Sequence, residues 1–222
     1  MEEGNANEKA HAFAIHTHAD LHLPAHAQHR LPHDGQAQAR AVGGMACART
    51  SHLAQQLLDL AALDDAQRPK PRDLDVAQWL RGALAQAAPQ AIARQIELSL
   101  DAPDTLPARL DQPAFESIAH KLIDNALRYT PHGGNVAVAL RREGAALQLS
   151  VQDDGPGIPA TEHQRVFERF YRGAGHAANG SGLGLAIVRQ AVLRMGGQVQ
   201  IGVGVNGKGV GFFVSIPFPH SA

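Results

Sequence analysis

Hydrophobic residues from position 72 onward recur with a period of two in some segments and near 3.6 in others, which predicts strands and helices. The short-period segments predict strands at 73–76, 95–101, 135–142, 146–153, 198–205 and 210–217. The long-period segments predict helices at 77–94, 112–128 and 183–195. Pro89 is expected to disturb the first of these helices. Together the elements predict an α+β fold, a two-layer α/β sandwich in which a mixed sheet carries helices on one face.

The helix predicted at 112–128 has the clearest amphipathic pattern. Asp111 precedes it as a capping residue, and Pro113 lies in its first turn, where its missing N–H is not needed. One face of the helix is apolar and consists of Phe115, Ile118, Ala119, Leu122, Ile123 and Ala126. The Pro-His-Gly-Gly run at 131–134 ends it.

The residues before 72 predict a different organisation from the folded domain at 72–222. Residues 1–47 are rich in alanine, histidine and glutamine without a sustained period, so we expect a weakly structured segment. Residues 48–66 predict an amphipathic helix, because leucines recur at i, i+4 and i+7 from Leu53, and a helix this short needs a partner. Residues 67–71 hold two prolines and predict a linker.

Composition excludes several classes of protein. Of the 222 residues, 44% are hydrophobic and 18% are charged, which excludes a wholly disordered chain. The net charge of −1 gives no sign of nucleic-acid or anionic-membrane binding. No apolar stretch is long enough to span a membrane, and the acidic N-terminus is unlike a signal peptide. The single cysteine, Cys47, excludes an internal disulfide, so we expect a cytoplasmic location.

Polar side chains form a stripe opposite the apolar face of the helix at 112–128. Lys121, Asn125 and Arg128 follow one another at i, i+4 and i+7, and Tyr129 lies at the helix end. An amide oxygen is a suitable ligand for Mg²⁺, a cation reaches phosphate, and an aromatic ring flanks a nucleoside. On this helix alone, an ordinary solvated face is the better interpretation.

Two carboxylates and a Gly-Pro-Gly turn follow the strand predicted at 146–153. A carboxylate such as Asp153 accepts a hydrogen bond from an exocyclic amino group, which adenine carries and guanine lacks at the same carbon. Gly155 and Gly157 would let the backbone approach the base closely. The alternative is a plain acidic turn.

A third glycine-rich segment leads into the helix at 183–195. Small residues at Gly180, Gly182 and Gly184 would expose backbone N–H groups and the positive end of the helix dipole to an anion. The segment is neither a P-loop nor a dinucleotide fingerprint, because its spacing differs from both. Residues 172–180 are small enough to form a lid over a ligand.

The order of these motifs is more specific than any one of them. They are Asn-Ala-Leu-Arg-Tyr-Thr-Pro at 125–131, Asp-Asp-Gly-Pro-Gly-Ile-Pro at 153–159, Val-Phe-Glu-Arg-Phe-Tyr-Arg at 166–172 and Gly-Ser-Gly-Leu-Gly-Leu at 180–185. Over roughly 72–218 the series resembles the ATP-binding catalytic domain of two-component sensor histidine kinases. The resemblance implies the Bergerat ATP-binding fold, shared with type II topoisomerase and mismatch-repair ATPases. It also implies that residues 53–64 are a short helical remnant of the family's dimerisation hairpin.

The resemblance implies a role for each motif residue. Asn125 would hold Mg²⁺, Asp153 would bind the adenine amino group, and Arg169 or Arg172 would face the terminal phosphate. The remaining nucleotide-binding residues would be Arg128, Tyr129, Gly155, Gly157, Gly180, Gly182, Leu183 and Gly184. The implied chemistry is phosphoryl transfer from Mg-ATP to a histidine and then to an aspartate of a response regulator. The implied partners are that regulator and a second copy of the chain.

The sequence departs from the family at Lys121, where histidine kinases usually have a second asparagine and hydrolytic relatives have a glutamate. A lysine is protonated at neutral pH and cannot act as a general base, which disfavours ATP hydrolysis of the topoisomerase type. The Lys121 ammonium would either neutralise phosphate charge or repel Mg²⁺, and the sequence does not choose between the two.

The second departure is the phosphoacceptor, because no histidine box of the family is found. The nearest string runs from His18 to Pro24 and includes His22, but it lacks an acidic residue directly after His18. Residues 1–47 are therefore a degenerate segment or the product of an altered reading frame. A helical metal-binding stripe is a weaker alternative for His18, His22, His26, His29 and His33, because two prolines interrupt it. The second function to consider is a kinase-like module that binds ATP or a partner without phosphorylating itself.

Overall fold

The computed structural model describes residues 71–173 and 181–218 of the chain. The helices are α2 (Val76–Ala93), α3 (Gln112–Tyr129) and α4 (Gly184–Arg194). The strands are β1 (Arg72–Asp75), β2 (Glu97–Asp101), β3 (Pro107–Leu110), β4 (Asn135–Glu143), β5 (Ala146–Asp153), β6 (Gln198–Val203) and β7 (Val210–Pro217). Short 3-10 helices are η1 (Ala160–Glu162), η2 (Arg165–Phe167) and η3 (Val205–Gly207). The segments predicted at 1–47 and 48–66 lie outside the described residues.

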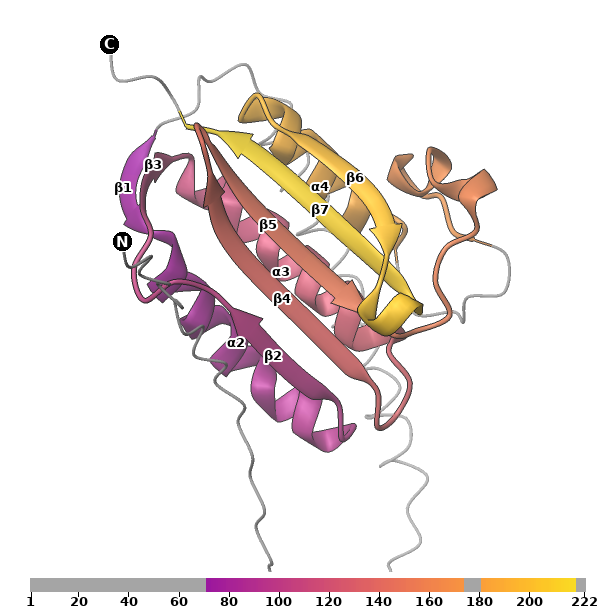
Figure 1. The fold of residues 1–222 in the computed structure, drawn as a ribbon. Coiled ribbons are helices and arrows are strands. Elements are labelled where there is room, and N and C mark those ends of the chain that lie inside the picture. The colour runs from indigo at the N-terminus through magenta and orange to yellow at the C-terminus, as the bar shows by residue number, and fades with distance from the viewer. Residues whose placement is uncertain (1–70, 174–180, 219–222) are drawn as a thin grey trace, which may run out of the picture.

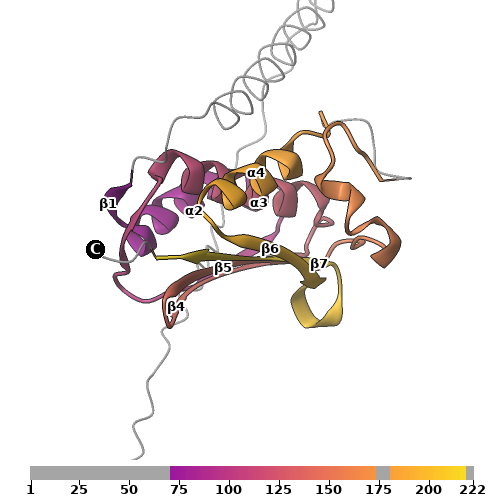
Figure 2. The same cartoon turned by 90° about the horizontal axis from the view of Figure 1, so that it is seen from above.

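The main sheet has five strands in the order β2-β4-β5-β7-β6. The pair β2–β4 is parallel and the other three pairs are antiparallel. Helices α2, α3 and α4 all lie on one face of this sheet (Figures 1 and 2). The predicted two-layer α+β sandwich is therefore confirmed. Within the described residues, a helix with both the length and the hydropathy needed to cross a membrane is absent.

The core lies between this sheet and helix α3. Alternate residues of β5 point toward the helices, and Leu147, Leu149 and Val151 are each 1% exposed. They meet the predicted apolar face of α3, on which Phe115 and Ile118 have no exposed surface. Full burial of one such side chain stabilises the fold by roughly 1.5–3 kcal/mol. The core therefore fixes α3 and β5 relative to each other.

The ends of α3 are held by polar contacts. Asp111 caps the first turn, because its Oδ1 accepts a hydrogen bond from the Ala114 N–H at 3.4 Å, as predicted. Its Oδ2 accepts a bond from Nε of Arg194 at 3.2 Å, and Arg194 is the last residue of α4. This largely buried ion pair ties the start of one helix to the end of the other.

Several details of the elements differ from the sequence-based expectations, among them the start of β2 at Glu97, two residues after its predicted start. Strand β3 was not predicted, because it has only four residues and pairs with β1 in a separate two-stranded sheet. Helix α2 continues past Pro89 to Ala93, since Pro89 is exposed and Ala91 beyond it is buried in the core. Strand β6 ends at Val203, two residues before its predicted end, because 204–209 forms a longer connection that contains η3.

Candidate functional site

Three segments far apart in the sequence meet near the C-terminal half of α3. The C-terminal half of α3 is itself one of the three, and the other two are the end of β5 and the N-terminus of α4 (Figures 1 and 2). Asn125 on α3 faces α4 closely enough that a methyl group added to Gly184 would lie 3.9 Å from the Asn125 Oδ1. The structure thus brings together the predicted metal-binding amide and the first residue of the predicted anion-binding helix.

Asp153, the last residue of β5, is only 3% exposed. Its Oδ1 accepts hydrogen bonds from the backbone N–H groups of Gly155 at 2.9 Å and Val210 at 3.4 Å. Burial raises the pKa of the Asp153 carboxyl above its ordinary value, although these two bonds act in the opposite direction. Among the described residues, no donor is hydrogen-bonded to the second oxygen, Oδ2. The carboxyl is therefore fixed through one oxygen, and the other is available to a ligand.

Glycines allow the backbone to pack closely around Asp153. A side chain on Gly204 or Gly209 would collide with the Asp153 carbonyl oxygen, and one on Gly155 would lie 2.9 Å from its Oδ1. Gly157 has a φ of +73°, and a methyl group there would lie 3.0 Å from the Gly209 carbonyl oxygen. The 204–209 connection thus packs directly on the end of β5.

Gly155 also joins the end of β5 to the end of α3. A methyl group on Gly155 would lie 2.8 Å from the carbonyl oxygen of Tyr129, the last residue of α3. Tyr129 itself is 38% exposed, and Arg128 is exposed beside it. Both polar side chains therefore lie on the surface next to the end of β5, which carries Asp153. Each of the two makes interactions of its own.

The segment that follows β5 makes a close backbone contact with the residues just before α4. The Phe170 N–H donates to the Gly182 carbonyl at 2.9 Å, and a methyl group on Gly182 would lie 2.7 Å from the Phe170 carbonyl carbon. Gly182 has a φ of +72°, a conformation that favours glycine. Arg169 and Arg172 are exposed on either side of Phe170. Gly180 lies outside the described residues.

Helix α4 begins at Gly184 without a side-chain cap. The Leu183 N–H instead bonds the Ser181 Oγ at 3.2 Å, and the Leu183 side chain is fully buried. The first turn carries no acidic residue. Its backbone N–H groups and positive dipole end are of the kind that suits an anion, and anion binding at this segment stays a prediction.

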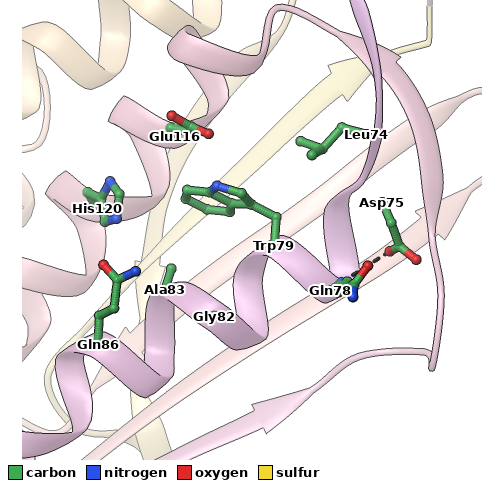
Figure 3. Close-up of a pocket in the computed structure, with 9 residues that line it drawn as sticks. All are labelled: Leu74, Asp75, Gln78, Trp79, Gly82, Ala83, Gln86, Glu116 and His120. Atoms are coloured by element: carbon green, nitrogen blue, oxygen red, sulfur yellow. Dashed lines mark hydrogen bonds between the residues drawn. The ribbon is translucent and has the colours of Figure 1, made fainter.

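A separate pocket of about 520 Å³ lies between α2 and the N-terminal half of α3 (Figure 3). It is lined by Leu74, Asp75, Gln78, Trp79, Gly82, Ala83, Gln86, Glu116 and His120. The Trp79 ring packs edge-on against Phe115 and His120, with ring centroids 5.4 and 5.2 Å apart. Its charged lining is acidic and includes no lysine or arginine, so it does not suit a polyphosphate.

No cluster of three or more histidine, cysteine, aspartate or glutamate side chains that would hold a metal ion occurs within 71–173 and 181–218. A divalent cation at this site would therefore need oxygen atoms from its ligand in addition to Asn125. This is the usual arrangement for Mg²⁺, which keeps waters and binds one or two protein groups together with phosphates. The residues present fit such an ion.

Sequence reasoning missed four residues that shape the site: Arg94, Gly204, Gly209 and Val210. The last three lie at or between the ends of the strands predicted at 198–205 and 210–217, and the high glycine content there was the one available signal. Arg94 bonds the carbonyl oxygens of Leu127, Arg128 and Thr130 at the end of α3, and no local pattern indicates this.

Comparison with known proteins gives consistent results. Residues 110–220 match the family described as histidine kinase-, DNA gyrase B- and HSP90-like ATPases. The chain is 34% identical to the swarming motility regulation sensor protein RssA of Serratia marcescens and 38% identical to the sensor protein kinase PmrB of Pseudomonas aeruginosa. Each match extends over 171 residues and covers 76% of this chain and 36% of the relative. The chain thus spans just over a third of the length of these curated relatives.

Two solved structures have the same fold, and one of them is a sensor histidine kinase. The mycobacterial sensor histidine kinase MprB aligns with a TM-score of 0.58 and 29% identity over 67% of this chain and 98% of that one. Full-length ShkA in complex with AMPPNP aligns with a TM-score of 0.73 and 27% identity over 87% of this chain and 41% of that one.

Proposed function

The chain belongs to the family of histidine kinase-, DNA gyrase B- and HSP90-like ATPases, and it contains the ATP-binding catalytic domain of sensor histidine kinases. On this premise we propose that it binds Mg-ATP and transfers the γ-phosphoryl group to a histidine, for relay to an aspartate of a response regulator. The relatives carry names of sensor kinases, and the ShkA structure contains AMPPNP, which supports this proposal.

The observation that carries the proposal is the buried carboxylate of Asp153. Oδ1 is held by two backbone N–H groups, so Oδ2 is pre-oriented as an acceptor. The exocyclic amino group of adenine is a donor of matching chemistry, whereas guanine presents a carbonyl oxygen at that carbon. Gly155 and Gly157 let the backbone pack closely around this carboxylate.

The phosphates would lie on the other side of the site, away from the Asp153 charge. The backbone N–H groups at Gly182 and Gly184 would bind phosphate oxygens at the start of α4, with Leu183 between them. Asn125 would hold Mg²⁺ through its amide oxygen, and the ion would neutralise phosphate charge when bound. Arg128 and Tyr129 would contact phosphate and the nucleoside, and Gly180 would belong to the phosphate-binding segment before α4.

The chain's contribution to the transfer would be positioning and electrostatics. A phosphoryl group needs its donor and acceptor oxygen or nitrogen in line, and it needs its spreading negative charge stabilised. Arg169 and Arg172, which flank Phe170, are the cations proposed to face the terminal phosphate. Lys121 adds a further ammonium one helical turn before Asn125, so no carboxylate is available at that position to activate water.

The test is incubation of the full chain with γ-³²P-labelled ATP and Mg²⁺, followed by mapping of acid-labile, base-stable label. We expect phosphohistidine in the parent protein and less of it in Asp153→Asn at an ATP concentration below saturation. The substitutions His18→Ala and His22→Ala then identify the acceptor, and label unchanged in both excludes these two residues.

The missing acceptor box favours a second candidate function, an ATP-binding module that does not phosphorylate itself. Binding of ATP without label on the chain would support it. Transfer of label to a separately supplied dimerisation helix pair from a sensor kinase would show instead that the catalytic machinery is intact and only the acceptor is lacking.

A further inference from the structure

Arg94, the residue directly after α2, reaches across to the far end of α3. Its Nη1 donates to the carbonyl oxygens of Leu127 and Arg128, the latter at 3.3 Å, and its Nη2 donates to the carbonyl oxygen of Thr130. The side chain is partly buried against this helix end. One guanidinium thus binds three backbone carbonyls within four residues.

These contacts satisfy groups that the helix itself leaves without partners. The last four carbonyls of an α-helix have no intrahelical donor. In α3 the Ala126 carbonyl receives the Thr130 N–H at 3.0 Å and the Thr130 Oγ1 at 2.7 Å. Arg94 supplies the donors for the next carbonyls, and its positive charge lies at the negative end of the helix dipole.

Arg94 also holds the chain beyond the helix. Its own carbonyl oxygen accepts a hydrogen bond from the Gly133 N–H at 3.1 Å. The next residue, Gly134, accepts a bond from the Glu97 N–H at 2.9 Å through its carbonyl. The turn between α3 and β4 is therefore fastened to the end of α2 and to the start of β2.

We propose that Arg94 is a positioning residue for nucleotide binding, which sets the last turn of α3 so that Asn125, Arg128 and Tyr129 face the phosphates. This inference rests on the proposed function. Arg94 acts only through the backbone of α3. Its loss should weaken binding of the phosphate and Mg²⁺ end of the nucleotide. It should leave the adenine end, at Asp153, unchanged.

Arg81 provides a matched control within the same helix. Its guanidinium also donates to three consecutive carbonyls, those of Ala102, Pro103 and Asp104, at 3.4, 2.7 and 2.8 Å. Those carbonyls belong to the loop between β2 and β3, which contributes no residue to the candidate site. The two arginines therefore make equivalent bonds, and only those of Arg94 reach α3.

The experiment compares Arg94→Gln, Arg94→Lys and Arg81→Gln in the full chain. A non-hydrolysable ATP analogue and its GTP counterpart are titrated calorimetrically, with Mg²⁺ and with EDTA, below the melting temperature of every variant. Arg94→Gln is expected to weaken binding of the Mg²⁺-ATP analogue about tenfold. The ratio of its affinities for the ATP and GTP analogues should stay within about twofold of the parent's. Most of the difference in affinity between Mg²⁺ and EDTA should be lost. Arg94→Lys should recover part of the loss, and Arg81→Gln should change the dissociation constant less than about twofold.

Equal weakening by Arg81→Gln and Arg94→Gln would overturn the proposal, as would wild-type affinity in a folded Arg94→Gln. An Arg94→Gln protein that is unfolded at 4 °C would overturn it too, because Arg94 would then serve folding. If the parent protein binds neither analogue, the proposed function itself fails. If the parent binds and Arg94→Gln binds equally well, only the role of Arg94 fails.

Discussion

The carboxylate of Asp154 accepts two hydrogen bonds from Asn135, one from the backbone N–H at 2.9 Å and one from the side-chain Nδ2 at 2.7 Å. Asn135 begins β4, so this contact fastens the start of one strand to the end of its neighbour. Asp153 precedes Asp154 directly, is the last residue of β5 and is buried, whereas Asp154 follows the strand and binds Asn135. Of two adjacent carboxylates, one therefore holds the sheet together and the other faces the candidate site.

We expect Asp153→Asn to weaken ATP binding and to reduce the preference for ATP over GTP. The asparagine oxygen can still accept from Gly155 and Val210, but its amide nitrogen would then replace Oδ2 and present donors to adenine. Loss of a hydrogen bond to a charged group costs about 1.5–3 kcal/mol, or roughly 10- to 100-fold in the dissociation constant. Calorimetric titration with both nucleotides measures the effect.

Asp154→Asn is the matched control for that substitution. It removes one of the two bonds to Asn135 and should lower the free energy of unfolding by about 1 kcal/mol, with little change in nucleotide selectivity. Wild-type affinity and selectivity in Asp153→Asn would refute the adenine assignment. A loss of selectivity in Asp154→Asn as large as in Asp153→Asn would argue for a general disturbance of the strand end.

The raised pKa of Asp153 predicts a specific pH dependence of stability. Burial raises the pKa in the folded state, so between the ordinary value near 3.8 and the raised value the folded protein binds more protons than the unfolded chain. The stabilising contribution of Asp153 is therefore complete below the ordinary pKa and is lost as pH rises through the raised one. Asp153→Asn has no ionisable group at this position, so its stability does not fall for this reason as the pH rises.

Urea unfolding of the ligand-free wild type and Asp153→Asn, from about pH 4 to neutrality, tests this dependence. The free energy of unfolding of the variant, relative to the wild type, should increase as pH rises. A difference between the two proteins that stays constant, or that decreases toward neutral pH, would contradict a raised pKa at Asp153.

Asn125→Ala is expected to remove the Mg²⁺ dependence of ATP binding. The substitution deletes the one amide oxygen proposed as a metal ligand, and the loss should approach about tenfold in the presence of Mg²⁺, equal to ~1.4 kcal/mol. Titrations with Mg²⁺ and with EDTA measure it. Asp124→Ala, at an exposed position of the same helix, is the control. Mg²⁺ dependence that persists in Asn125→Ala would move the ion to another group.

The elements that the sequence predicted well are those that depend on local pattern. Buried and half-buried positions alternate over all eight residues of β5 and over the first six of β4. The α3 face predicted as apolar is buried throughout. Asp153 was found for a similar reason, since a carboxylate followed by glycines at a strand end is a local signal. The strand β3 has four residues and gains its partner from β1, whose paired residues lie 32 to 38 positions earlier, so no local pattern identifies it.

Contacts between distant segments set the parts of the site that the sequence did not predict. Val210 donates to Asp153 across 57 positions, and the bonds from Arg94 to the end of α3 span 33 to 36 positions. Each of these contacts uses a backbone group, whose position depends on the fold and not on the residue type. The motif residues were recognisable, but the groups that orient them were not.

Gly209 packs against the backbone of Asp153. Its φ is +68°, and a methyl group there would collide with the Asp153 carbonyl oxygen and lie 2.7 Å from the Gly155 nitrogen. Gly209→Ala should therefore displace the end of β5, weaken ATP binding and reduce its preference over GTP. Gly207→Ala is the control, because Gly207 has a φ of +78° with no atom within 4 Å of the added methyl group. Strain at a positive φ alone costs roughly 1–2 kcal/mol. Thermal unfolding and calorimetric titration of both variants separate the backbone strain, which the two share, from the collision, which only Gly209→Ala has. Equal nucleotide affinity in the two variants would show that the packing of Gly209 does not position Asp153.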